Sequence, residues 1–302
     1  MTTKKKQTNS TKQGTLFPLG APNARVQTLV RPATRPVWTE NKAKLIETYL
    51  RLFVLITHHG VYIDVFAGPQ QPDKPDTWAA RLVLLSKPRW FRKFFLFEID
   101  NEKVQMLEDL RAGQPPPDKK KKEPKREIKI FPGDANEKIL GILNERSIRM
   151  KDATFCLLDQ HTNQCDWATV QALANYKTGN KIELFYFFAN KWLPRSLAAL
   201  KDRERARKWY WEKLRDMRPI ERAELLAERF RTELGYKHAV PWPIYDKKDG
   251  STIMFFMVHA TDHPAATGLM DRAYHKAVIS EKDFKQVAMA FDAGPTSRGG
   301  ST

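Results

Sequence analysis

One repeating pattern constrains the fold of this chain more than any other feature: apolar runs of strand length end in an acidic residue, and a helical stretch follows. In the first copy, residues 61–70, β-branched and aromatic residues flank Asp64, and the run breaks at Gly68 and Pro69. Apolar runs of this length are typical of parallel strands that are buried on both faces. Further copies end at Glu98 and Asp100, at Asp134 and at Asp159.

The alternation of strands and helices predicts the fold class. Strands are expected at 61–66, 94–97, 128–131, 154–158 and 182–188, with helices between them. This order gives a parallel sheet covered by helices on both faces. Residues 237–245 and 251–259 predict a hairpin, and 264–276 a last helix. We therefore predict an α/β, Rossmann-like fold with a mostly parallel seven-stranded sheet, a terminal antiparallel hairpin and a helical insert.

Composition sets the expected domain boundaries. The segment 196–235 is densely charged and contains the aromatic run Trp209-Tyr210-Trp211. It is either an exposed, salt-bridged helical pair or a lid or base-stacking surface. The expected parts are a basic, mostly disordered arm at 1–37, the first part of the core at 38–195, the helical insert at 196–235, the hairpin and helix that complete the core at 236–280, and a tail at 281–302.

The chain is strongly basic, with a net charge of +17 and a pI of about 9.8. This charge suits an anionic partner such as nucleic acid. Residues 1–37 hold seven basic and no acidic residues, and residues 111–129 hold eight basic and three acidic residues. These segments either act as soluble tethers or contact phosphates. The candidate nucleic-acid-binding residues are Lys119, Lys120, Lys121, Lys122, Arg195, Arg203 and Arg207.

Two cysteines, Cys156 and Cys165, provide neither a disulfide framework nor a zinc ligand set. No apolar run approaches the roughly 18 residues that span a bilayer, and no apolar core of a secretory signal follows the basic N-terminus. We therefore expect a soluble, cytoplasmic protein.

The acids at the strand ends are the candidate site. In parallel α/β sheets, ligands bind beyond the carboxyl ends of the strands, where Asp64, Glu98, Asp134 and Asp159 would meet. Each acid could instead cap the helix that follows it. Clustered carboxylates could also hold Mg²⁺ or Mn²⁺ in a metal-dependent phosphoryl-transfer enzyme, although the favoured interpretation includes no metal.

Several local sequences resemble the three-Cys-motif partner protein family, a branch that is similar to class I S-adenosylmethionine-dependent methyltransferases. The similar segments are 42–50, 62–69, 97–100, 158–160, 192–195 and 259–270, and the resemblance spans about 38–280. It implies a methyltransferase-like fold in which the seventh strand pairs antiparallel with the fifth. It also implies a bacterial protein that is encoded beside a radical-type three-cysteine protein, often near mobile elements or phage genes.

The resemblance implies a role for each strand end. Asp64, Phe66 and Gly68 would hold the methionine part of S-adenosylmethionine, and Glu98 or Asp100 would accept hydrogen bonds from its ribose. Asp134 with Ala135 would lie by the adenine amine. Asp159 and Gln160 would face the methyl acceptor. His161 beside them is either a general base or an exposed loop histidine.

Two positions depart from the pattern of the class. Gln70-Gln71-Pro72 stands where a second glycine would let the backbone approach the cofactor, and Asp159 is followed by Gln160-His161-Thr162 in place of prolines and an aromatic residue. Three hypotheses therefore stay open. The first is a methyltransferase that acts on or with nucleic acid, for which the resemblance implies a phage-related or defence context. The second is a catalytically degenerate nucleic-acid-binding or scaffolding partner, and the third is a metal-dependent nuclease.

Overall fold

The computed structural model describes residues 41–161, 164–191, 214, 217–246 and 252–278. Within these residues seven strands form one sheet, in the order β3-β2-β1-β4-β5-β7-β6. The strands are β1 (Gly60–Asp64), β2 (Phe91–Glu98), β3 (Glu127–Pro132), β4 (Thr154–Leu158), β5 (Glu183–Phe188), β6 (His238–Tyr245) and β7 (Ile253–Thr261).

The directions of the strands confirm the predicted fold class. Strands β1 to β5 pair in parallel, whereas β7 lies antiparallel between β5 and β6. The β6–β7 hairpin therefore adds to the β5 side of the sheet, with the seventh strand beside the fifth. This is a Rossmann-like, methyltransferase-like fold.

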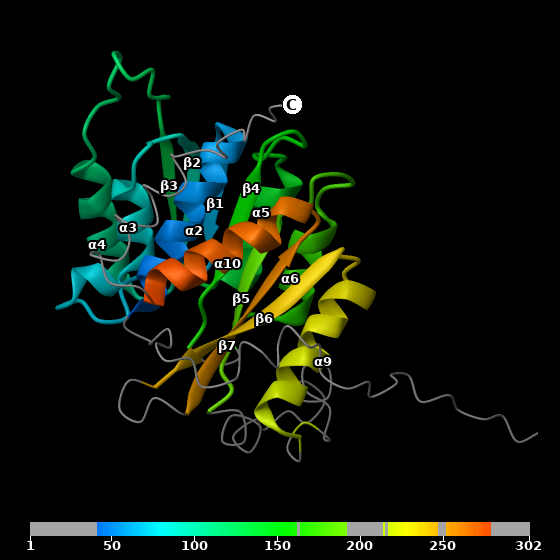
Figure 1. The fold of residues 1–302 in the computed structure, drawn as a ribbon. Coiled ribbons are helices and arrows are strands. Elements are labelled where there is room, and N and C mark those ends of the chain that lie inside the picture. The colour runs from blue at the N-terminus through cyan, green and yellow to red at the C-terminus, as the bar shows by residue number, and fades with distance from the viewer. Residues whose placement is uncertain (1–40, 162–163, 192–213, 215–216, 247–251, 279–302) are drawn as a thin grey trace, which may run out of the picture.

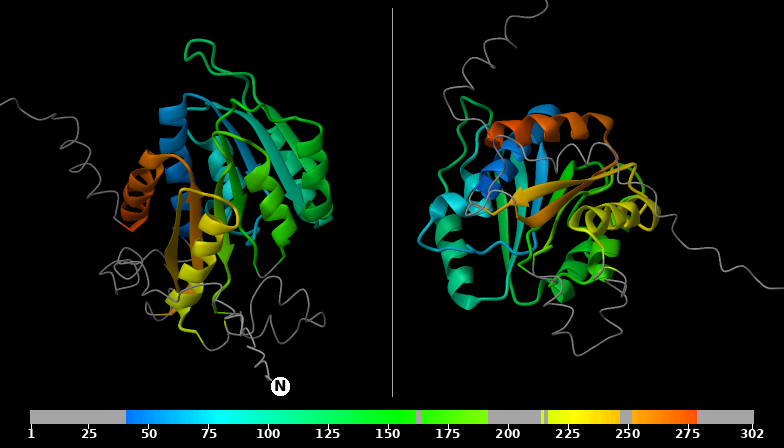
Figure 2. Two further views of the ribbon diagram at one scale, coloured as in Figure 1. Left: turned by 90° about the vertical axis from the view of Figure 1, so that its right-hand side faces the viewer. Right: turned by 60° about the horizontal axis from the view of Figure 1, so that its bottom comes forward.

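Helices cover both faces of the sheet (Figures 1 and 2). They are α2 (Lys42–Thr57), α3 (Ala79–Leu85), α4 (Asn101–Ala112), α5 (Ala135–Asn144), α6 (Trp167–Asn175), α9 (Pro219–Thr232) and α10 (Pro264–Val278), with a short 3-10 helix, η2 (Pro75–Thr77). Helices α2, α3, α4 and α10 pack their apolar residues against one face of the sheet, and helices α5, α6 and α9 pack theirs against the other face. None of the helices in the described ranges is long and apolar enough to cross a membrane.

The alternation of side chains along β1 explains why its run is apolar throughout. Tyr62 packs into the α2 side of the core, whereas Val61 and Ile63 pack into the α5 side. Successive residues of a strand point to opposite faces, and here both faces are covered. All five residues of β1 are buried, which leaves Asp64 as a buried acid at its end.

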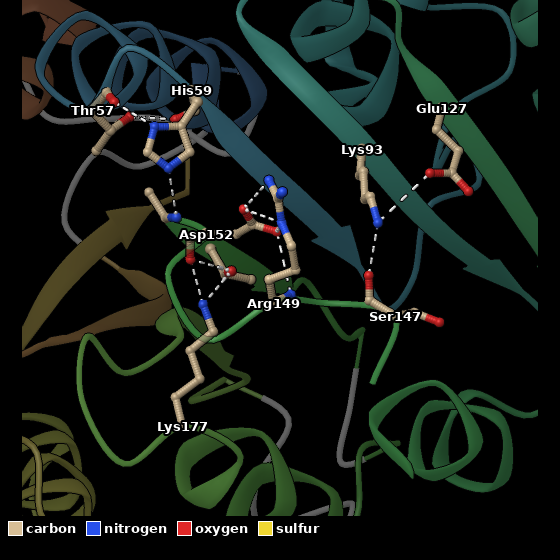
Figure 3. A network of polar contacts seen from close by, with 10 residues as sticks. Thr57, His59, Lys93, Glu127, Ser147, Arg149, Asp152 and Lys177 are labelled. Atoms are coloured by element: carbon tan, nitrogen blue, oxygen red, sulfur yellow. Dashed lines mark hydrogen bonds and ion pairs between the residues drawn. The ribbon is translucent and has the colours of Figure 1, made fainter. Parts of the chain in front are cut away.

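Helix α2 buries residues such as Leu45, Ile46 and Tyr49 at three- and four-residue spacing, and it ends at His58, whose φ of 56° is left-handed. His59 then fastens the start of β4, because its Nε2 accepts a hydrogen bond from the Ala153 amide at 3.2 Å (Figure 3). The other ring nitrogen, Nδ1, lies 2.6 Å from the Thr57 carbonyl oxygen. These contacts fix the histidine tautomer, with the proton on Nδ1, and give His59 a structural role.

The predicted helical insert lies partly outside the described residues, as does its aromatic run at 209–211. Its described part includes α9, which packs on β6 and β7 through buried residues such as Ala223, Leu226 and Phe230. Helix α9 therefore belongs to the layer of helices on that face of the sheet.

Candidate active site

Parallel pairing brings the predicted acids to one edge of the sheet. Asp64 at the end of β1 pairs with Leu157 of β4 and with Leu96 of β2. Glu98 and Asp159 therefore follow on the neighbouring strands. We call this the carboxyl edge, formed by the ends of β1 to β4, and the opposite one, where these strands begin, the amino edge.

Asp64 is fully enclosed, with 1% of its surface exposed. Tyr62 Oη donates a hydrogen bond to its Oδ2 at 2.7 Å, and the Phe66 amide donates to its Oδ1 at 3.2 Å. The pKa of Asp64 is raised to about 7, mainly by burial; the Tyr62 hydrogen bond lowers this pKa, and the nearby Asp159 charge raises it. At neutral pH, the protonated and ionised forms of Asp64 are therefore both populated.

Glu98 and Gly68 form a tight junction between the ends of β1 and β2. The Gly68 amide donates to Glu98 Oε2 at 2.9 Å, and the Ile99 and Asp100 amides donate to Oε1 at 2.9 and 3.0 Å. A Cβ at Gly68 would lie 2.2 Å from Glu98 Oε2, so the junction requires glycine. A carboxylate can accept about four hydrogen bonds, so Glu98 keeps room for one more donor.

The other two acids of this edge are helix caps. Asp100 accepts hydrogen bonds from the Glu102 and Lys103 amides at the start of α4, and Asp134 accepts one from Asn136 at the start of α5. Ala135 is the first residue of α5 and is buried. These acids satisfy amides that a helix leaves unpaired at its start. Of the two residues predicted to bind the ribose, Glu98 is therefore the one that contacts the loop containing Gly68.

Asp159 forms a buried ion pair with a lysine from the start of α2. Lys42 Nζ donates to Asp159 Oδ1 at 2.7 Å, and Gln70 Nε2 lies 3.3 Å from Oδ2. The ammonium also lies over two aromatic rings, 4.8 Å from the Phe187 centroid and 5.2 Å from that of Phe255. A carboxylate with aromatic faces is the environment in which proteins bind organic cations, and here it holds a cation from the same chain.

Gln160 and His161, the other residues expected to face the methyl acceptor, take different positions. Gln160 is buried, its Nε2 donates to the Phe187 carbonyl at 3.1 Å, and its Oε1 accepts from the Cys165 amide at 2.9 Å. Its amide is thus used to hold the loop after β4. His161 is exposed, and partial desolvation followed by the Lys42 charge lowers the pKa of its ring.

A small cavity lies among these residues. Asp64, Phe66, Gly68, Gln70 and Asp159 all line it, together with residues of η2 and α3. Its volume is about 10 Å³, on a measure in which one water molecule needs roughly 10–15 Å³. In this conformation, the side chains of Lys42 and Gln70 close the space between the ends of β1 and β4.

The four predicted basic residues that the structure describes lie away from this site. Lys119, Lys120, Lys121 and Lys122 lie in the segment between α4 and β3, which projects from the amino edge (Figure 1). Arg195, Arg203 and Arg207 lie outside the described residues. Nucleic acid bound to the four lysines would therefore lie at the end of the sheet opposite Asp64.

Lys42 is the site residue that the sequence analysis missed as a functional candidate. A signal for it exists: it lies three and four residues before the buried Leu45 and Ile46, on the apolar stripe of α2. Residues at this spacing share a helix face. A lysine on such a stripe needs an acidic partner, and Asp159 provides it 117 residues away.

Within the described residues, no group of three or more His, Cys, Asp or Glu side chains is arranged to hold a metal ion. The reason is visible at the carboxyl edge, where Asp100 and Asp134 turn to their helices and Asp159 pairs with Lys42.

The strand order and the antiparallel β7 define a Rossmann-like, methyltransferase-like fold. No protein-family model and no curated protein matches it. The chain is similar to the methyltransferase domain of bacterial CtHen1-CN, with 15% identity over 73% of this chain and 98% of that chain and a TM-score of 0.40.

Two further solved structures are similar. A proposed methyltransferase from Thermobifida fusca YX has 14% identity over 74% of this chain and 81% of that chain, with a TM-score of 0.44. Trm1 from Pyrococcus horikoshii, in complex with S-adenosyl-L-methionine, has 12% identity over 79% of this chain and 59% of that chain, with a TM-score of 0.41. At these identities the likeness concerns the fold.

Proposed function

We propose that this chain is an S-adenosylmethionine-dependent methyltransferase whose cofactor lies on the carboxyl edge over Gly68 and Glu98. The observation that carries the proposal is the junction of these two residues, in which the Gly68 amide lies 2.9 Å from Glu98 Oε2 and no Cβ fits between them. An acid at the second strand end beside a glycine loop is the arrangement by which α/β sheets bind the ribose of a nucleotide cofactor.

The residues of this edge fit the adenosine half of the cofactor. Glu98 has an acceptor position left for a ribose hydroxyl, and Asp134 with Ala135 stands at the next strand end for the adenine. When bound, S-adenosylmethionine would supply an activated methyl group for in-line displacement. Asp64, Phe66 and Gly68 would orient its methionine part, since they line the cavity at the end of β1.

The methionine half requires Gln70 to withdraw, because the cavity holds about one water molecule. The hydrogen bonds of the Gln70 side chain are long: 3.3 Å to Asp159 and 3.5 Å from Lys42. Bonds of this length are weak. Gln70 also begins an exposed stretch that runs to Asp76, so it can move without disturbing the core.

Calorimetry with S-adenosylmethionine and S-adenosylhomocysteine tests the proposal. We expect one site per chain, and we expect Glu98→Ala to weaken binding about tenfold or more because a charged hydrogen-bond acceptor is lost. Glu102→Ala is the matched control, since it removes the same charge from an exposed position in α4. Equal weakening by the two variants, or no heat with the wild type, would contradict the assignment.

The Lys42–Asp159 pair supports a second candidate, a non-catalytic partner protein that keeps the fold with the pocket closed. In this case, the ammonium of Lys42 permanently fills the space beside Asp159 at the end of β4, where a cationic ligand would otherwise bind. Lys42→Met distinguishes the candidates: a catalytic pocket binds the cofactor in the wild type, whereas a closed one binds it only in the variant or in neither.

We also propose that the partner is nucleic acid, within the context of the three-Cys-motif partner family. The net charge of +17 and the lysines at 119–122 support this. Phosphate contacts release counterions, so the affinity for DNA or RNA should fall steeply with salt. Binding that is absent at low salt, or that does not change between low and high salt, would refute a nucleic-acid partner.

A further inference from the structure

A second pocket lies at the amino edge, far from Asp64. It has a volume of about 360 Å³ and lies between the end of α4, the segment 113–126 and the start of β3 (Figure 1). Four basic side chains line it: Arg89, Arg111, Lys125 and Arg126. The volume is in the range of small-molecule sites, roughly 300–1,000 Å³.

The pocket carries more positive charge than its own acids balance. Arg89 Nη1 lies 3.2 Å from Glu123 Oε2, and Arg111 pairs with Glu108. No carboxylate of the described residues lies within ion-pair distance of Lys125 or Arg126. Lys125 and Arg126 therefore make no ion pair within the described residues, although the Glu123 charge also acts on Arg126. The four cations exceed the two ion-paired acids by two charges, which an anion with two charges would balance.

Arg126 is held in place and is incompletely bonded. Its Nη1 donates to the Leu84 carbonyl at 2.8 Å and to Gln114 Oε1 at 3.1 Å, and its guanidinium lies 4.4 Å from the Phe94 ring centroid. Its Nε is buried and has no hydrogen-bond partner. The pKa of Arg126 is lowered to about 10, chiefly by burial and then by the Arg89 charge, and the Glu123 charge offsets only part of this effect. An anion between the two guanidiniums would relieve this repulsion.

Arg89 fixes the shape of the pocket. It is buried, with 8% of its surface exposed, and donates to the Pro115 carbonyl at 3.0 Å and to the Pro116 carbonyl at 3.4 Å. The proline segment is therefore tied to the start of β2. Pro115, Pro117 and Ile128 give the pocket an apolar wall beside its cations. The site is built before any ligand arrives, which reduces the cost of binding.

We propose that this pocket binds a phosphate monoester attached to a flat or apolar group, such as a nucleoside 5′-phosphate. Guanidinium groups bind phosphate through paired, charge-assisted hydrogen bonds. The dianion matches the two cations that form no ion pair among the described residues, and the apolar wall suits a base or a sugar. This inference is independent of the proposed methyltransferase activity, because no residue of the carboxyl edge takes part.

Calorimetry on the full chain with AMP, inorganic phosphate and adenosine tests the inference. We expect AMP to bind more tightly than inorganic phosphate, and adenosine not to bind. Lys125→Gln should weaken AMP binding about tenfold. Lys151→Gln, which removes an exposed lysine elsewhere at the amino edge, should not. Lys125 is exposed, so its variant should fold as the wild type does.

A competition experiment distinguishes two sources of the phosphate, a free nucleotide and the 5′ end of a nucleic acid. A 5′-phosphorylated tetranucleotide that competes with AMP would show that a nucleic-acid end enters the pocket, and failure to compete would assign it to free nucleotides. Both results support a phosphate monoester site. Adenosine that binds as well as AMP, or equal effects of Lys125→Gln and Lys151→Gln, would overturn it.

Discussion

Lys42 Nζ lies 2.7 Å from Asp159 Oδ1, and both side chains are more than nine-tenths buried. The pair joins the first residue of α2 to the end of β4. Isolated buried ion pairs contribute little to stability overall, because desolvation offsets their attraction. The position of the Lys42–Asp159 pair at the carboxyl edge is therefore better explained by a role in the candidate active site than by a contribution to the stability of the fold.

Removing Lys42 tests how strongly the pair is coupled. We expect Lys42→Met to lower the free energy of unfolding by about 3 kcal/mol, because Asp159 is left buried without its partner. Lys42→Met with Asp159→Asn should lose less than the sum of the two single variants. Urea denaturation measures all of these, with the exposed Lys44→Met as the control. Strict additivity would show that the two side chains do not interact.

Asp64 should make stability depend on pH. The pKa of its carboxyl is about 7 in the folded chain and near 3.8 in an ordinary one, so the folded state binds more protons between these values. Stability should therefore fall as pH rises from about 4 to about 7, by on the order of a few kcal/mol. Asp64→Asn should flatten this part of the curve. Parallel curves for the wild type and the variant would exclude Asp64 as the source.

Gly68→Ala tests whether the contact between Gly68 and Glu98 specifically requires a residue without a Cβ. A Cβ there collides with Glu98, so we expect a lower melting temperature and a loss of cofactor binding. Gly141→Ala is the control: the position lies inside α5 with nothing within 4 Å of a new Cβ. Alanine there should stabilise the helix, by about 1 kcal/mol at most. A Gly68→Ala chain that binds cofactor as the wild type does would remove the junction from the site.

The sequence was sufficient to predict the sheet because buried parallel strands and amphipathic helices are local patterns. The run 61–66 gave β1, and the spacing of Leu45, Ile46 and Tyr49 gave α2. The same patterns placed Asp64, Glu98 and Asp159 at one edge. They could not show that Asp100 and Asp134 cap helices, because an acid at a strand end has the same local signature in both roles.

The contacts between side chains within the site could not be predicted either, and the reason is different. Lys42 and Asp159 are 117 residues apart, and Gln160 uses its amide on Phe187 of the next strand. Which of several polar side chains at an edge meet depends on the register of the strands and on the packing of α2. Neither is encoded in the spacing of residues along one segment.

The structure of the chain with S-adenosylhomocysteine at saturating concentration tests the central claim most directly. Our account predicts the homocysteine part beside Asp64 and Gly68, a ribose hydroxyl on Glu98, the adenine by Asp134 and Ala135, and Gln70 withdrawn from Asp159. An unliganded carboxyl edge with the Lys42–Asp159 pair and the Gln70 contacts unchanged, or a ligand bound elsewhere, would contradict it.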